Sequence, residues 1–126
     1  MSKRPAAGDI RLKRAYEQPA EGDGLRILVD RLWPRGLSKA GAAIDRWEKD
    51  IAPSTGLRQW FGHAPGRWEE FRRRYTGELR EHAALLGELR ELARESPITL
   101  VYSARDEAHN DAVVLRDVLL GRSTEG

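Results

Sequence analysis

Two short apolar segments limit the folds open to this chain more than any other feature. Residues 25–32 and 98–102 are rich in Leu, Ile and Val and have the length of β-strands. About seventy mainly helical residues separate them, and so long a crossover favours parallel pairing with helices packed on the sheet. We therefore predict that the two strands are adjacent and parallel, with Leu28 and Leu100 buried.

The remaining segments fit a sheet of about three strands. Residues 10–16 alternate apolar and basic side chains, which is typical of a half-exposed strand at an edge. Residues 38–51 are ambiguous, since the i, i+3 spacing of Ile44 and Trp47 permits a short helix. The fold class predicted is thus α/β: a small layered domain with a short, mainly parallel sheet covered by helices.

Three helical stretches are expected after residue 56. A short helix covers 57–61, and a long helical stretch starts near Pro65, with a possible break between residues 77 and 81. The last helix is expected to start at Asp106 or Glu107 and to end at Gly121.

Length and composition point to one domain. With 126 residues, 40% of them hydrophobic, the chain can bury one core, so we expect a single domain over 1–126 with an ordered core of about 10–120. Residues 1–8 and 122–126 lack apolar periodicity and are expected to be flexible. The chain has no cysteine, no apolar stretch of membrane-spanning length and no signal-peptide pattern. These features favour a cytoplasmic setting without membrane contact and leave the oligomeric state open.

Polar residues follow both apolar strands. Ligands in open parallel sheets lie beyond the carboxyl ends of the strands, so we expect these residues to meet in one cleft. Arginines and the free amides at a helix start bind phosphate or carboxylate, and the expected ligand is a small anion. The candidate ligand-binding residues are Arg31, Trp33, Arg35, Ser103, Arg105 and Asn110.

A different interpretation of the same arginines stays open. They can pair with Asp30, Asp45 and Asp106 in a structural ion network, in which case no anion is needed. Ser103 lacks the flanking glycines of a nucleophile elbow, so an N-cap or anion contact is the more natural role for its hydroxyl.

Evidence for catalysis is weaker. Asp30 and His63 are candidates for proton transfer, and His109 could line the same site. The three histidines lack metal-ligand spacing, so no metal site is expected, and no cofactor is expected either.

Several ordered motifs run along the chain. They are residues 30–37, Trp47 with 51–54, 57–58, 60–61, 68–71, Tyr75, 78–79, 100–106, Asn110 and Ala112. Together these motifs resemble the YeaO-like family, which belongs to the group named domain of unknown function 488. The resemblance covers roughly residues 10–120 and implies a small cytoplasmic bacterial or archaeal α/β domain, with no established reaction. Some relatives carry regulator or methyltransferase labels, but this chain has neither a helix-turn-helix pattern nor a glycine-rich cofactor loop.

Three functions are therefore open. The first is binding, with or without catalysis, of a small phosphorylated or nucleotide-like anion. The second is a protein-interaction or structural domain whose arginines form ion pairs. The third is a nucleic-acid-associated regulator, since residues 1–36 hold 8 basic and 5 acidic side chains and Arg72–Arg74 form a basic run.

Overall fold

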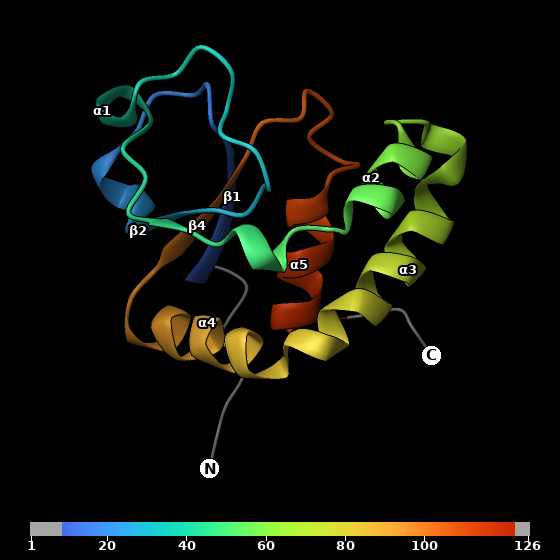
Figure 1. The fold of residues 1–126 in the computed structure, drawn as a ribbon. Helices are drawn as coiled ribbons and strands as arrows, with labels where there is room; N and C mark the ends of the chain where they lie inside the picture. Colours follow the sequence, from blue (N-terminus) through green and yellow to red (C-terminus); the bar gives the residue numbers. More distant parts are fainter. Residues whose placement is uncertain (1–8, 123–126) are drawn as a thin grey trace.

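A parallel sheet of four strands forms the centre of the computed structural model, which describes residues 9–122 (Figure 1). Its strands lie in the order β1-β4-β2-β3. Leu25 to Leu28 pair in parallel with Ile98 to Val101, which confirms the predicted neighbours. The strands are β1 (Ile10–Arg14), β2 (Leu25–Leu28), β3 (Arg46–Trp47) and β4 (Ile98–Tyr102).

The central strand β4 explains the two layers of the molecule. It pairs with β1 on one side and β2 on the other, and all five of its residues are buried. Ile98 and Leu100 belong to the large core cluster that α3, α4 and α5 share with the sheet. Val101 and Leu28 point to the opposite face, where they pack against half-buried side chains of residues 33–47. The predicted burial of Leu28 and Leu100 is confirmed.

The helices mostly lie where the periodicity predicts them. Residues 80–82 form a 3₁₀ turn between α3 and α4, at the break that the sequence permitted. Ser54 caps α2, since its hydroxyl accepts a hydrogen bond from the Leu57 amide. The helices are α1 (Lys39–Ala42), α2 (Thr55–Phe61), α3 (Trp68–Leu79), α4 (Ala83–Glu95) and α5 (Asp111–Leu119).

Two expected element boundaries are wrong. Strand β2 ends at Leu28 and not at residue 32, because the chain bends after one more ladder bond, from the Val29 amide to the Val101 carbonyl. Helix α5 starts at Asp111, since the preceding Asp106 carboxylate accepts the Ala108 and His109 amides in a turn of its own.

The ambiguous stretch 38–51 holds a fourth strand as well as a helix. Helix α1 ends at Ala43, whose φ of 50° is left-handed, and Trp47 lies in β3 beside β2. The i, i+3 spacing of Ile44 and Trp47 is therefore not helical. The termini predicted to be flexible lie outside the described residues, except for Arg122, which is exposed and paired with Asp117.

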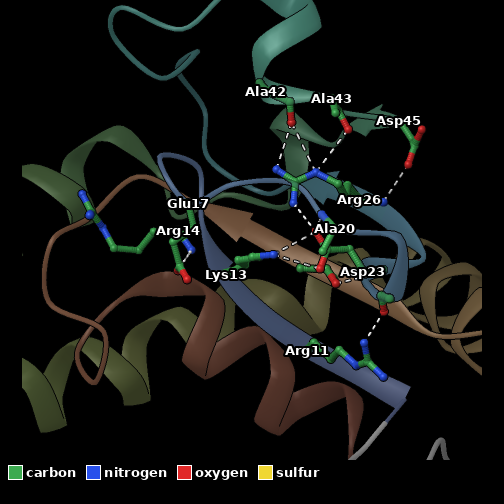
Figure 2. A network of polar contacts seen from close by, with 12 residues as sticks. Arg11, Lys13, Arg14, Glu17, Ala20, Asp23, Arg26, Ala42, Ala43 and Asp45 are labelled. Carbon is green, nitrogen blue, oxygen red and sulfur yellow. Dashed lines mark hydrogen bonds and ion pairs between the residues drawn. The ribbon is translucent and has the colours of Figure 1, made fainter.

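A buried polar network joins β1, β2 and the end of α1 (Figure 2). Arg26 is only 3% exposed, and its guanidinium donates to the Asp23 carboxylate and the Ala42 carbonyl. Lys13 also pairs with Asp23 at 3.1 Å. Burial alone would raise the pKa of Asp23, but hydrogen bonds from the Ala20 amide, Lys13 and Arg26 outweigh it and lower that pKa. Lys13 on β1 and Arg26 on β2 are thus both paired within the protein.

Candidate functional site

A cavity of about 680 Å³ lies beyond the carboxyl ends of β2 and β4. Because the two strands are parallel neighbours, the segments that follow them reach the same edge of the sheet. Its lining combines four arginines, three aspartates and several aromatic or apolar side chains. Pro34, Ala52, Pro53 and Phe71 are its buried lining residues, whereas Arg35, Arg58 and Arg105 are exposed. The cavity therefore has a closed interior and a basic rim.

The cavity brings together seven of the eight leading candidates from the sequence, whereas His109, suggested as a further lining residue, does not line it. Both candidate proton-transfer residues belong to this set, although the structure does not test what any of the seven does. His63 is exposed, has a left-handed φ of 58°, and lies 6.0 Å from Phe61 between ring centroids. The seven residues are Asp30, Arg31, Trp33, Arg35, His63, Ser103 and Arg105.

Asn110 is the residue that the structure does not bring to the cavity. Its side chain is 2% exposed and caps α5 by accepting the Val113 amide. Its amide nitrogen donates to the Asp106 carbonyl, and its side chain also bonds the Tyr102 hydroxyl. These internal partners occupy the groups that a ligand would have needed.

Asp30 and Ser103 connect the two strand ends. The Asp30 Oδ2 atom accepts from the Ser103 amide at 2.9 Å and from its hydroxyl at 2.8 Å. The Trp47 indole donates to the Asp30 carbonyl at 2.8 Å, which holds the backbone from the other side. Two donors on one oxygen fix the orientation of the Asp30 side chain at the cavity wall. Ser103 thus acts as a donor to Asp30.

A second aspartate, Asp111, lies directly against Asp30. The two side chains share a hydrogen bond, which requires that one carboxyl group carries a proton. Asp111 is half-buried at the start of α5, and burial of its carboxyl group is the main cause that raises its pKa well above 3.8. The neighbouring Asp30 charge and the hydrogen bond raise the pKa of Asp111 further, against the opposing effect of the Ala112 amide. Asp111 is therefore the protonated member of the pair.

The cavity arginines have no acidic partner in the part of the chain that the structure describes. Among residues 9–122, no carboxylate forms an ion pair with Arg31, Arg35, Arg58 or Arg105. The Nε atom of Arg31 is buried and has no hydrogen-bond partner. Three arginines, Arg35, Arg58 and Arg105, are exposed at the rim.

The carboxylates expected to neutralise these arginines bind elsewhere. Asp30 accepts from Ser103, and Asp45 accepts the Arg26 amide. The hydrogen bond from the His109 ring at 2.9 Å is the main cause that lowers the pKa of Asp106. The described contacts therefore contain none of the ion pairs that the network interpretation requires.

Aromatic side chains form part of the cavity wall. Trp33 packs edge to face against Trp47 with ring centroids 5.4 Å apart, and its indole donates to the Leu37 carbonyl. At the rim, the Tyr16 hydroxyl donates to the Arg35 carbonyl, so the segment after β1 is tied to the segment after β2. The side of the cavity near Trp33 therefore has a shape set by tertiary contacts.

Two lining residues that carry charge were missed by the sequence reasoning. Asp111 follows the helix cap directly, where an acidic residue is ordinary, so no local signal set it apart. Arg58 lies on α2, far from both strand ends in the sequence, and only its place in the family-like motif at 57–58 marked it.

The basic run Arg72–Arg74 does not add to the site. Arg73 and Arg74 both pair with Glu70, and Arg72 lies 3.6 Å from Glu69 and 3.8 Å from Asp117. Within 9–122, no three potential metal ligands gather in one place, and no helix has the length and apolar character to span a membrane.

Comparisons with known proteins agree on one family. The model described as "Inactive DUF488-N3 subclade" matches residues 9–125. The uncharacterized protein YeaO of Escherichia coli (strain K12) is 44% identical over 111 residues, which cover 88% of this chain and 96% of that protein. Uncharacterized proteins of Mycobacterium bovis and Mycobacterium tuberculosis are each 45% identical over 113 residues, covering 90% of this chain and 95% of theirs. No solved structure matches. The chain therefore belongs to the YeaO-like DUF488 group, in the DUF488-N3i family.

Proposed function

We propose that this protein binds a small anionic ligand, such as a phosphorylated metabolite, in the cavity beyond β2 and β4, and that it does so in the cytoplasm. One observation carries the proposal: four arginines line that cavity, and none has an acidic partner within the described residues. Guanidinium groups that have no ion-paired carboxylate repel one another, and a bound anion reduces that repulsion. Bidentate hydrogen bonds to phosphate or carboxylate oxygens add to the attraction.

Binding is favoured over catalysis. The family description calls its subclade inactive, and both the amide and the hydroxyl of Ser103 donate to one Asp30 oxygen, which holds Ser103 at the cavity wall. The structural alternative has less support, because its cavity arginines form no ion pairs within the described residues. The nucleic-acid alternative has less support, because the basic run it would use is engaged. Arg73 and Arg74 pair with Glu70 on the surface of α3, which leaves little positive charge there for nucleic acid.

Thermal unfolding against phosphate concentration at fixed ionic strength tests the proposal. Specific binding stabilises the folded state by about 1.4 kcal/mol for each tenfold rise in phosphate above Kd. Arg35→Ala and Arg105→Ala should lose this dependence, whereas Arg73→Ala removes an arginine outside the cavity and should keep it.

The result that contradicts the proposal is equally clear. If phosphate, carboxylates and nucleotides all leave the wild-type melting temperature unchanged at fixed ionic strength, the cavity does not bind anions. If Arg73→Ala loses the dependence together with the other variants, the effect is general charge screening and not a site.

A further inference from the structure

The cavity has two chemically different parts. Its rim carries the exposed side chains of Arg35, Arg58 and Arg105, and its half-buried wall carries Asp30 and Asp111. A simple anion complements only the first part. The second part, the two aspartates, is complemented by a positively charged group on the ligand.

The aspartate pair has no cation of its own. Within residues 9–122, no Lys, Arg or His forms an ion pair with Asp30 or Asp111. Their hydrogen bond is kept by one proton shared between two carboxyl groups.

The buried Asp23 has a different environment. Asp23 pairs with two cations, Lys13 at 3.1 Å and Arg26 at 2.7 Å. Buried carboxylates generally need such partners, and Asp23 has them within the protein. The Asp30–Asp111 pair instead faces a cavity, so its complementary cation can come from a ligand.

A third group in the cavity also lacks a partner. The Nε–H of Arg31 is buried and donates to no acceptor in the described part of the chain. Arg31 lines the same cavity as the aspartate pair. An acceptor oxygen on the ligand would satisfy it.

Building on the proposed function, we propose that the ligand is a small zwitterion of the aminoalkyl phosphate class. Its phosphate lies among the arginines, and its primary ammonium group lies against Asp30 and Asp111. When the ammonium group arrives, the carboxyl group of Asp111 releases its proton to solvent, so that two carboxylates face one cation. Binding is then linked to the release of up to one proton.

Few other titratable or charged groups lie near the aspartate pair. Tyr75 on α3 interacts with both aspartates, but its hydroxyl donates to the Ile51 carbonyl, and burial raises its pKa well above 10.0, so it stays neutral. His63 is the histidine that lines the cavity. The remaining charged groups around the cavity are Arg31, Arg35, Arg58, Arg105 and Asp106.

Titration calorimetry with two matched ligand series tests the inference. We would compare 2-aminoethyl, 3-aminopropyl and 4-aminobutyl phosphate with ethyl, propyl and butyl phosphate at pH 7 and fixed ionic strength. At least one amine should bind about tenfold or more tightly than its partner without the amine. Titrations in two buffers of different ionisation enthalpy should report up to one more proton released with the amine than with its alkyl partner.

Variants locate the effect. Asp111→Asn and Asp30→Asn should each abolish the amine preference. Both variants are made, so that the test still holds if one of them fails to fold. Asp117→Asn removes an aspartate from the same helix outside the cavity lining and should keep the preference. His63→Gln should keep the proton release.

Each contrary result has one meaning. Equal affinity of amine and alkyl phosphate at every length overturns the inference and leaves the proposed function standing. An amine preference that survives Asp111→Asn and Asp30→Asn also overturns it, because the ammonium group then binds elsewhere. If neither series nor inorganic phosphate binds, the proposed function fails and this inference fails with it.

Discussion

Replacing Asp111 by Asn should stabilise the protein at neutral pH. The substitution keeps the size of the side chain, and its Nδ2–H can donate to Asp30 as the carboxyl proton does. It removes the one group of the pair whose ionisation the fold opposes. The gain in stability equals the free energy that wild type spends to keep Asp111 protonated in the folded state, because the unfolded chain in water favours the carboxylate.

The size of the gain follows from proton counting. Burial first, and the Asp30 charge second, raise the pKa of Asp111 above 3.8, so in the folded state it keeps a proton that the unfolded chain loses. The folded state then binds one proton more than the unfolded state, and stability falls as pH rises. The slope is about 1.4 kcal/mol per pH unit between the ordinary pKa and the raised one. Each pH unit along that slope is a sizeable part of the roughly 5–15 kcal/mol that stabilises a typical domain.

Urea unfolding from pH 4.5 to pH 8 measures this difference. The advantage of Asp111→Asn over wild type should grow with pH and level off above the raised pKa of Asp111. Asp117→Asn, which changes a half-buried aspartate of the same helix beside Arg72 and Arg122, should show no such growth. A constant difference between Asp111→Asn and wild type, or a variant less stable at every pH, would refute the protonated pair.

Three further predictions concern the scaffold. Asp23→Asn should destabilise the protein at neutral pH, typically by about 3–5 kcal/mol, because it breaks a buried ion pair. This loss of stability should become smaller as pH falls from 3.8 through the lowered pKa of Asp23, which urea unfolding over a series of acidic pH values measures. Gly24→Ala should unfold at markedly lower temperature in calorimetry, since its φ is +64° and a Cβ there would overlap the Pro97 carbonyl oxygen. Tyr75→Phe should cost about 1–3 kcal/mol in urea unfolding, because the buried Ile51 carbonyl loses its donor.

Much of the architecture could be predicted from the sequence. The apolar run of Ile98–Tyr102 indicated a central strand, and the length of the helical crossover indicated its parallel pairing with the strand that begins at Leu25. Both signals are local in origin, because they depend on side-chain type and chain length. Element ends were less predictable: β2 stops at Leu28 although the apolar pattern runs on to residue 32. The Ser103 amide donates to the Asp30 carboxylate there, a contact between distant parts of the chain.

The sequence by itself determined the class of the fold and the segments that surround the cavity, since strand ends in a parallel sheet meet at one edge. It could not decide which charges face one another there. Asp30 and Asp111 lie in segments that become neighbours only when α5 packs beside β4, and no spacing rule joins them. Likewise, whether Arg35 or Arg105 has an acidic partner depends on side-chain directions that only packing sets. Pairing of charges is a property of three-dimensional distance, and the chemistry of this cavity was therefore decided by the tertiary structure.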